Sequence, residues 1–407
     1  MVQENVKMSI RSIPTQKISR GQTPKARNSK GKKAPSQQSP PSERVELSGR
    51  KAKEVAPKLS LQQQATSNLQ TNLAASLPPT LAQPIAEAFK SGFVTGYLTP
   101  TSIEAQCEKL AQDFPDLVDL VKTGIKTHGY DGSNKDVHGN SELVYLRLGP
   151  KTEDRDKKVG IFQYAAPHAR ERMNPMSMME FAHQLVHNYD PSSEDPKVKA
   201  NTALMNDLDI YVAINTNPDG HNFAAYDDPM WRKNRAPLEG GEYGVDINRN
   251  YPYQWEKSDD VSSIVYSGAG PASEPETQAL VKVTNDHPNI KFVVDWHSYG
   301  REIRRPMGAT ESDDEFYDTM HGRVQQAMKS VAGNDYSPVV SQVTEGTSDD
   351  FFYHTKGMYS TVMETGTDFT PEESEALEVM RESVEGAHEF LRVAQDYAQG
   401  SSSSQAQ

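Results

Sequence analysis

Short apolar segments alternate with helix-like segments through the middle of this chain, and this alternation constrains the fold more than any other feature of the sequence. Four apolar segments are rich in β-branched and aromatic residues, as buried strands are; they cover residues 158–165, 209–215, 290–295 and 358–363. Helix-like stretches lie between them, one with Pro175 at its expected first position and one where Ser273 and Glu276 fit a capping box. Strands that alternate with helices predict an α/β fold with a mixed, largely parallel sheet flanked by helices.

Charge and aromatic residues are distributed unevenly along the 407 residues. Residues 1–60 contain 14 Lys/Arg and 4 Asp/Glu, and no aromatic residue precedes Phe89. A basic segment without aromatic side chains cannot bury enough apolar surface to offset its chain entropy, so a disordered extension is predicted there. Beyond it we expect a Gln/Ala/Pro-rich linker able to form short helices over 61–95, one globular domain over 96–395, and a flexible tail over 396–407.

The basic N-terminal region has two interpretations. Its Lys/Arg clusters, such as KGKK at 30–33, could contact an anionic partner. Alternatively the region is a leader or pro-segment without a specific partner, and its composition favours this second interpretation. Whether residues 1–95 are removed is left open by the sequence.

Composition also excludes several kinds of protein. Cys107 is the only cysteine, so any metal must be held by His and carboxylate side chains rather than by thiolates. The formal net charge is −13, and an acidic globular domain is not expected to bind nucleic acid. No apolar run approaches the about 18 residues of a membrane span, and the N-terminus lacks the apolar core of a secretory signal. The cytoplasm is therefore the default location, with export by an unrecognised route left open, and we expect a monomer.

Polar side chains follow three of the predicted strands, at the points where those strands end. His168 and Glu171 follow the first strand, His297 follows the third, and Glu364 follows the fourth. In open α/β sheets, ligands bind at the carboxyl ends of the strands. Two His side chains and a carboxylate can hold zinc with one position open, and a separate Glu can then act as a general base. Taken singly, the same residues also fit a solvated turn or a buried, hydrogen-bonded histidine.

A further pair of histidines must be compared with His168 and His297 as candidate metal ligands. His183 and His187 lie four residues apart in a helix-like segment, which is the spacing of some helical zinc sites. No Glu follows His183, as that type of site requires, so we interpret the pair as the polar stripe of an amphipathic helix.

Seven short motifs occur in an order and at spacings that identify a resemblance. They are PHARE at 167–171, NPDG at 217–220, MWRKNR at 230–235, GVDINRN at 244–250, SEPET at 273–277, DWHSYG at 295–300 and GTSDD at 346–350. Over roughly residues 97–390 the chain resembles the zinc metallocarboxypeptidases of the carboxypeptidase A type. The resemblance implies their eight-stranded type of sheet and one Zn²⁺ per chain. It also implies hydrolysis of the C-terminal peptide bond of peptides or proteins.

The resemblance assigns the catalytic roles residue by residue. His168, Glu171 and His297 would be the zinc ligands. Glu364 would take a proton from the attacking water and pass it to the leaving amine. Arg232 would polarise the scissile carbonyl and stabilise the oxyanion that forms from it.

The substrate-binding roles follow from the same resemblance. Asn248 and Arg249 would hold the C-terminal carboxylate of the substrate, a task that suits the planar fork of a guanidinium. Asp246 would accept a hydrogen bond from the free ring nitrogen of His168 and orient it. Arg170 would line the outer substrate subsites.

The sequence departs from the family pattern at the substrate pocket. Gln342 stands where relatives usually carry a Tyr on a loop that closes over the substrate. Arg304 and Arg305 replace an apolar wall of the pocket for the C-terminal side chain, and one of them is expected to enter that pocket. Asp349 lies where an acidic pocket floor would select Lys or Arg, although it could pair with Arg304 instead. We therefore expect a preference for acidic C-terminal residues slightly ahead of basic ones.

Two alternative functions remain from the sequence. Related catalytic domains also act as amidases on cell-wall peptides or on side-chain amides of amino acids. The absent loop Tyr also permits a catalytically impaired zinc-binding module that only recognises peptides.

Overall fold

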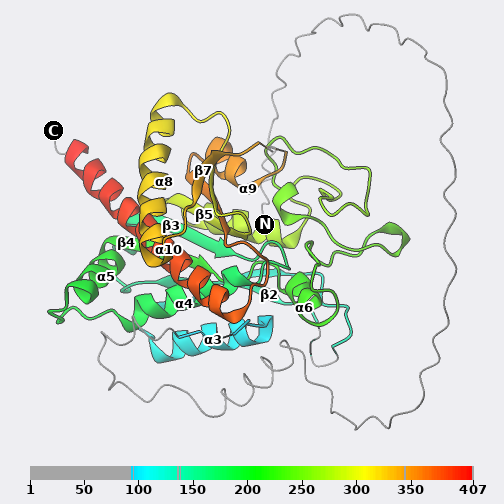
Figure 1. The fold of residues 1–407 in the computed structure, drawn as a ribbon, viewed down its shortest axis with the longest axis horizontal. Helices are drawn as coiled ribbons and strands as arrows, with labels where there is room; N and C mark the ends of the chain where they lie inside the picture. The colour runs from blue at the N-terminus through cyan, green and yellow to red at the C-terminus, as the bar shows by residue number, and fades with distance from the viewer. Residues whose placement is uncertain (1–92, 95, 135–136, 138, 343–344, 406–407) are drawn as a thin grey trace, which may run out of the picture. The chain divides into compact units, whose positions relative to one another are not determined.

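The computed structural model describes residues 93–405 except residues 95, 135, 136, 138, 343 and 344. The predicted extension over 1–60 and nearly all of the predicted linker over 61–95 lie outside the described residues. Within the described part, eight strands form one mixed sheet in the order β1-β2-β4-β3-β5-β8-β6-β7 (Figure 1). The strands are β1 (Val118–Lys126), β2 (Glu142–Leu148), β3 (Val159–Ala165), β4 (Leu208–Ala213), β5 (Ile290–Ser298), β6 (Glu302–Arg305), β7 (Ser337–Val340) and β8 (Tyr359–Thr365).

The centre of the sheet confirms the predicted strands and the predicted fold class. Strands β4, β3, β5 and β8 are parallel neighbours, and each overlaps one of the four apolar segments recognised in the sequence. Strands β1 and β2 add antiparallel pairs at one edge, and β6 pairs antiparallel with β8 toward the other. Because the carboxyl ends of the four parallel strands meet at one edge, the residues that follow them are brought together there.

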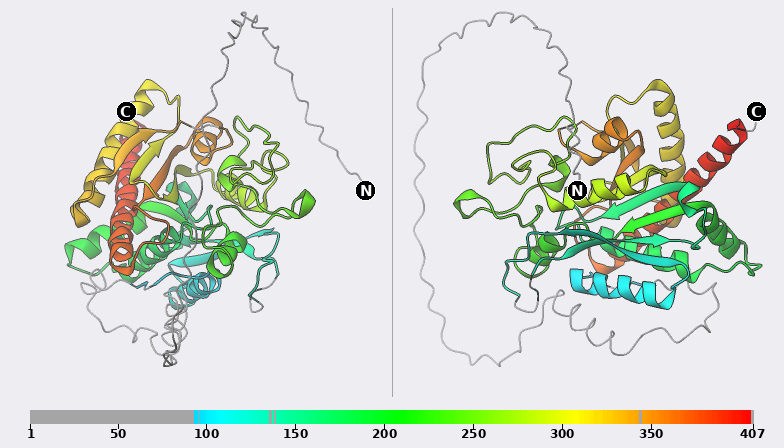
Figure 2. Two further views of the ribbon diagram at one scale, coloured as in Figure 1. Left: turned by 45° about the vertical axis from the view of Figure 1, so that its right-hand side comes forward. Right: turned by 180° about the vertical axis from the view of Figure 1, so that it is seen from behind.

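Helices cover both faces of the sheet, as two views of the ribbon show (Figures 1 and 2). A hydrophobic core lies on each face of the sheet, and the side chains of β3 alternate between the two. Ile161 and Ala165 belong to the larger core, and Phe162 and Tyr164 belong to the smaller core on the other face. The helices are α3 (Pro100–Asp113), α4 (Met173–His187), α5 (Pro196–Asp207), α6 (Pro218–Tyr226), α7 (Pro275–Asp286), α8 (Glu311–Ala332), α9 (Ser348–Asp350) and α10 (Glu373–Gln405). Shorter helical turns are η1 (Arg155–Lys157), η2 (Glu239–Gly241), η3 (Ile247–Arg249) and η4 (Phe351–Thr355).

Two predicted helix starts are wrong in detail. Helix α4 begins at Met173, so Pro175 lies inside its first turn rather than at its first position. The capping box at α7 does not form, because Pro275 is the first helical residue and Glu274 is the N-cap. Ser273 therefore lies one residue too early to cap the helix and donates its hydroxyl to Glu274 instead.

The predicted flexible tail over 396–407 is also corrected, because α10 continues to Gln405. Tyr397 explains why the helix does not stop at 395. Its ring packs against Phe292 and Tyr359, with ring centroids 5.3 and 6.0 Å apart, and so extends the apolar face of α10 beyond the predicted end. Packing of that ring stabilises the helix just beyond residue 395.

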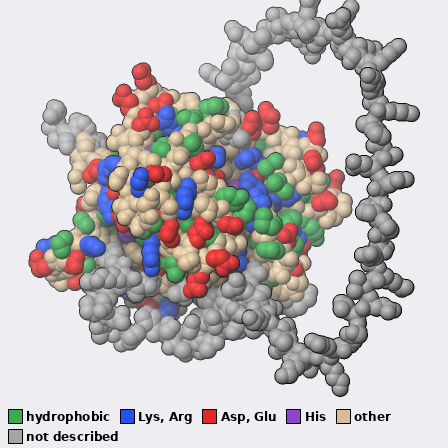
Figure 3. All heavy atoms as spheres, in the orientation of Figure 1, with side chains coloured by type: hydrophobic (Ala, Val, Ile, Leu, Met, Phe, Trp, Pro, Cys, Tyr) green, Lys and Arg blue, Asp and Glu red, His purple; other side chains and the backbone are tan. Residues whose placement is uncertain are grey.

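The described residues bear on two of the sequence predictions, namely the absence of a membrane span and the distribution of charge. None of the described helices combines the length and the apolar character that crossing a membrane requires. Figure 3 shows acidic and basic side chains interspersed over the face turned to the viewer.

The packing of α10 on the sheet gives a prediction about stability. Phe390 on α10 is 1 % exposed and packs edge-to-face on Trp296. Phe390→Ala is expected to lower the free energy of unfolding by about 3–5 kcal/mol, measured by urea denaturation of the full chain. Val331→Ala on the exposed side of α8 is the control and should change it by less than about 0.5 kcal/mol. Equal effects of the two substitutions would contradict the assignment of the core.

Candidate metal centre

The turn after β3 places two of the predicted ligands. Ala166 adopts a positive φ of 61°, which turns the chain sharply at the end of the strand. Thr216 donates from its backbone N and from Oγ1 to the carbonyl of Ala165, so the segment after β4 fixes the turn. A further backbone bond from the N of Glu171 to the carbonyl of His168 tightens the next turn. The side chains of His168 and Glu171 therefore point toward a common position beyond the end of β3.

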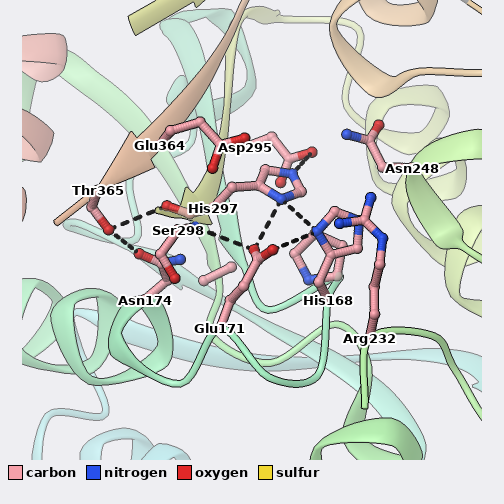
Figure 4. A network of polar contacts seen from close by, with 12 residues as sticks. His168, Glu171, Asn174, Arg232, Asn248, Asp295, His297, Ser298, Glu364 and Thr365 are labelled. Atoms are coloured by element: carbon pink, nitrogen blue, oxygen red, sulfur yellow. Dashed lines mark hydrogen bonds and ion pairs between the residues drawn. The ribbon is translucent and has the colours of Figure 1, made fainter. Parts of the chain in front are cut away.

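The third predicted ligand comes from the neighbouring strand. His297 belongs to β5, which continues to Ser298 and so runs further than the segment predicted from the sequence. Glu171 lies between the two imidazoles, with Oε1 2.8 Å from Nδ1 of His168 and Oε2 3.1 Å from Nδ1 of His297 (Figure 4). The three side chains are buried, and their candidate ligand atoms lie within 4.8 Å of one another.

The distal nitrogen of each imidazole faces its own carboxylate. His168 Nε2 lies 3.1 Å from Oδ1 of Asp246, and His297 Nε2 lies 2.9 Å from Oδ2 of Asp295. Metal-binding histidines commonly have such partners, which fix the ring and raise the basicity of the nitrogen that binds the metal. Two imidazole nitrogens and one carboxylate, supported in this way, fit a tetrahedral Zn²⁺ with its fourth position open.

The electrostatics of the centre favour a bound cation. Burial alone would raise the pKa of Glu171, but the adjacent imidazoles outweigh it and hold that pKa well below its usual value. Burial likewise lowers the pKa of His297, but Asp295 and Glu171 outweigh burial and hold it well above the usual value. Asp246, Asp295 and Glu171 thus place three buried carboxyl groups around two histidines. A positive ion between the rings would compensate this excess of acid.

Glu364 and Arg232 lie beside the three candidate ligands. Glu364 on β8 is the register partner of His297 on β5, so the two side chains project from the same edge of the sheet. Burial raises the pKa of Glu364 to about 7, and the nearby charge of Glu171 adds to this shift. Arg232 donates from Nε and Nη2 to Oδ2 of Asp246, at 3.0 and 2.9 Å. Asp246 therefore fixes Arg232 and His168 at the same time.

The predicted carboxylate clamp lies on η3, across the centre from Glu364 (Figure 4). Asp246 caps this turn by accepting a bond of 3.0 Å from the backbone N of Asn248. The side-chain Oδ1 of Asn248 accepts a bond of 2.8 Å from the backbone N of Ser348. Arg249 follows directly and donates to the carbonyl of Asn248.

The remaining predicted site residues lie around this group. Arg170 stacks over the ring of Phe369 at 4.2 Å. Gln342 is exposed and precedes residues 343 and 344, which are outside the described part. Arg304 and Arg305 point to opposite faces of β6, as predicted for neighbours on a strand: Arg305 pairs with Asp314 and Asp318 on α8.

Arg304 and Asp349 do not form the ion pair that the sequence allowed. Arg304 pairs with Glu302 two residues earlier on β6, and its Nε lies 3.9 Å from Glu364. Asp349 is buried, accepts a hydrogen bond from Ser341, and has a pKa that burial raises above the usual value. Residues i and i+2 of a strand share a face, so Glu302 lies beside Arg304 on β6 and forms the ion pair.

Sequence analysis missed three residues of this region. Asp295 lies two residues before His297 on β5, and that spacing was the available signal, because both side chains share a face of the strand. Glu302 has the same relation to Arg304. Ser348 carried no signal, since its contact with Asn248 joins residues 100 positions apart.

Sequence comparison relates most of the chain to known proteins. The zinc carboxypeptidase family matches residues 103–386. A metallocarboxypeptidase A-like protein of Trichophyton verrucosum (strain HKI 0517) is 32 % identical over 243 residues, which are 56 % of this chain and 53 % of that protein. Mouse (Mus musculus) carboxypeptidase A4 is 29 % identical over 263 residues, 62 % of this chain and 58 % of the relative. The chain thus spans little more than half the length of these curated relatives.

Solved structures agree on the fold. A crystal structure of thrombin-activatable fibrinolysis inhibitor aligns with a TM-score of 0.65 at 22 % identity, over 82 % of this chain and 86 % of that one. Carboxypeptidase A of Helicoverpa armigera aligns with a TM-score of 0.64 at 21 % identity, over 83 % and 80 % of the two chains. The family match covers most of the chain, and it includes the strands and turns that carry the candidate metal centre. The chain belongs to the zinc carboxypeptidase family.

Proposed function

We propose that this protein is a zinc-dependent metallocarboxypeptidase that hydrolyses the C-terminal peptide bond of peptides or proteins. One observation carries the proposal: His168, Glu171 and His297 converge on a point beside Glu364 and Arg232, with the Asn248/Arg249 clamp on the other side of that point. Zn²⁺ held by the three ligands would act as a Lewis acid, which polarises a carbonyl and lowers the pKa of water.

The residues of the chain supply the rest of the chemistry. Asn248 and Arg249 bind the terminal carboxylate of the substrate, which limits cleavage to the last peptide bond. Arg232, held by Asp246, donates to the scissile carbonyl oxygen as negative charge develops there. Glu364 removes a proton from the attacking water and returns it to the nitrogen of the leaving residue.

Two charged residues were predicted for the pocket of the C-terminal side chain, Arg304 and Asp349. Arg304 on β6 lies on the face of the sheet that also carries Glu364 of β8, and its side chain is 36 % exposed. Asp349 is buried and hydrogen bonded to Ser341, and burial opposes its charged form. We propose that Arg304 recognises the substrate directly, which favours an acidic C-terminal residue over a basic one.

A test of the function uses the full chain and peptides that differ only in the C-terminal residue, with products identified by mass. Loss of one residue is expected, abolished by a zinc chelator and restored by added zinc. Faster release of Asp or Glu than of Lys or Arg would support the role of Arg304. If the protein holds zinc but shortens no peptide, the exopeptidase function is wrong. An amidase or a peptide-recognition module without activity would then be the better explanation.

A further inference from the structure

A chain of polar contacts links one predicted metal ligand to the carboxylate clamp. His297 Nε2 lies 2.9 Å from Oδ2 of Asp295. The same Oδ2 accepts a hydrogen bond of 2.6 Å from Oγ of Ser348. The backbone N of Ser348 donates to Oδ1 of Asn248 at 2.8 Å. An ion pair therefore joins His297 to Asp295, and two hydrogen bonds join Asp295 to Ser348 and Ser348 to Asn248.

Ser348 fixes the orientation of the clamp amide. The amide of Asn248 has one oxygen that accepts and one nitrogen that donates. Because the N–H of Ser348 occupies the oxygen, the nitrogen is the group left for a ligand, and a nitrogen donor is what a carboxylate requires. Asp246 holds the same residue from the other side through its backbone N. The amide nitrogen of Asn248 is thus oriented to donate to a carboxylate even when no ligand is bound.

The contact chain is buried along its whole length. Ser348 is fully buried, and the exposed fractions of His297, Asp295 and Asn248 are 1, 2 and 9 %. In such an environment, a displaced polar group finds no water to replace its lost partner. A change in the position of Asn248 is therefore expected to disturb the hydrogen bonds of Ser348, and through them the ion pair between Asp295 and His297.

We propose that Asp295 and Ser348 are positioning residues that couple occupation of the clamp to the affinity of the metal centre. A carboxylate on Asn248 fixes Ser348, which fixes Asp295 and hence the ring of His297. Binding free energies are reciprocal, so the carboxylate raises zinc affinity by the factor by which zinc raises carboxylate affinity. The inference rests on the proposed function only in taking His297 as a zinc ligand and Asn248 as part of the clamp.

The test measures the zinc dissociation constant of the full chain by competition with a chelator. The constant is measured without any added ligand, with N-acetylglycine, and with N-acetylglycinamide, which lacks the carboxylate. N-acetylglycine at saturation is expected to tighten zinc binding at least about 5-fold, and the amide to leave it unchanged. Asp295→Asn is expected to weaken zinc binding about 10–100-fold without any ligand.

Ser348→Ala separates coupling from direct contact between the carboxylate and zinc. It removes a hydrogen bond to Oδ2 of Asp295 but leaves the contact between Asp295 and His297 in place. Zinc affinity without ligand should therefore fall less than in Asp295→Asn, while the effect of N-acetylglycine disappears. Ser360→Ala, a substitution of another buried serine that lies outside the contact chain, should keep the effect. An unchanged N-acetylglycine effect in Ser348→Ala, or no effect in the wild type, would overturn the inference.

Failure of this inference can be told from failure of the proposed function. The zinc measurement requires no turnover, and the peptide assay requires no coupling. Peptide cleavage without coupling rejects only the positioning roles, and coupling without cleavage rejects only the catalytic proposal.

Discussion

Replacing Glu364 with Gln is expected to lower kcat for peptide cleavage by about 10³-fold while leaving the zinc content unchanged. Glu364 is not among the three side chains that converge on the metal position, so the substitution removes a base without removing a ligand. The amide nearly matches the carboxylate in shape, but it cannot accept the proton of the attacking water. Zinc bound per chain and the steady-state rate for the best peptide of the C-terminal set are the two measurements.

A second buried carboxyl group provides the control for this substitution. Glu276 is fully buried, and burial together with Glu274 raises its pKa to about 8, so at neutral pH it is mainly protonated. Glu276→Gln therefore replaces one neutral group by another and should leave kcat within about 2-fold. If Glu364→Gln keeps more than about a tenth of the wild-type rate, general-base catalysis by this residue is wrong.

The pH dependence of the wild type follows from the same carboxyl group. Burial raises the pKa of Glu364 to about 7, and the base acts in its deprotonated form. The rate should therefore fall as the pH decreases through the pKa, and a cation at the metal position moves this fall to lower pH. The Glu364→Gln variant should lose this acidic limb.

The sequence predicted much of this structure because its strongest signals are local. Each of the four central strands is an apolar run, and His168, His297 and Glu364 lie at or near the ends of such runs. Parallel strands gather their carboxyl ends, so the approximate location of the centre followed from strand positions alone. The resemblance of the motifs then supplied the roles that we propose for individual residues.

Other features depend on contacts that no local pattern records. Strand alternation predicted that Arg304 and Arg305 point to opposite faces, but it did not show which of them lies beside Glu364. The contact of Ser348 with Asn248 joins two turns that are remote in sequence. The end of α10 depends on the packing of Tyr397 against β5 and β8, which exists only after the sheet has formed.

His297→Gln is expected to abolish tight zinc binding. Substitution of a residue that only supports a metal ligand typically lowers metal affinity by about 10–100-fold, and the loss in His297→Gln should be larger. The variant removes one of the three proposed ligands and also removes the partner of Asp295 in its ion pair. Because zinc binds the folded state, zinc at about 100 times its dissociation constant stabilises the wild type by about 2.7 kcal/mol. Thermal unfolding of the wild type with and without zinc should show this gain, and the variant should show none.

His183→Gln is the matched control for the loss of zinc. His183 forms a stacked pair with His187 on α4, and its Nε2 contacts Gln106. Neither histidine of this pair belongs to the convergent group, so the variant should keep the full zinc-dependent rise in unfolding temperature. Comparing each protein with itself, with and without zinc, removes the direct effect of each substitution on stability. A zinc response retained by His297→Gln but lost in His183→Gln would move the metal centre to α4, and the mechanism proposed for Glu364 would then lose its basis.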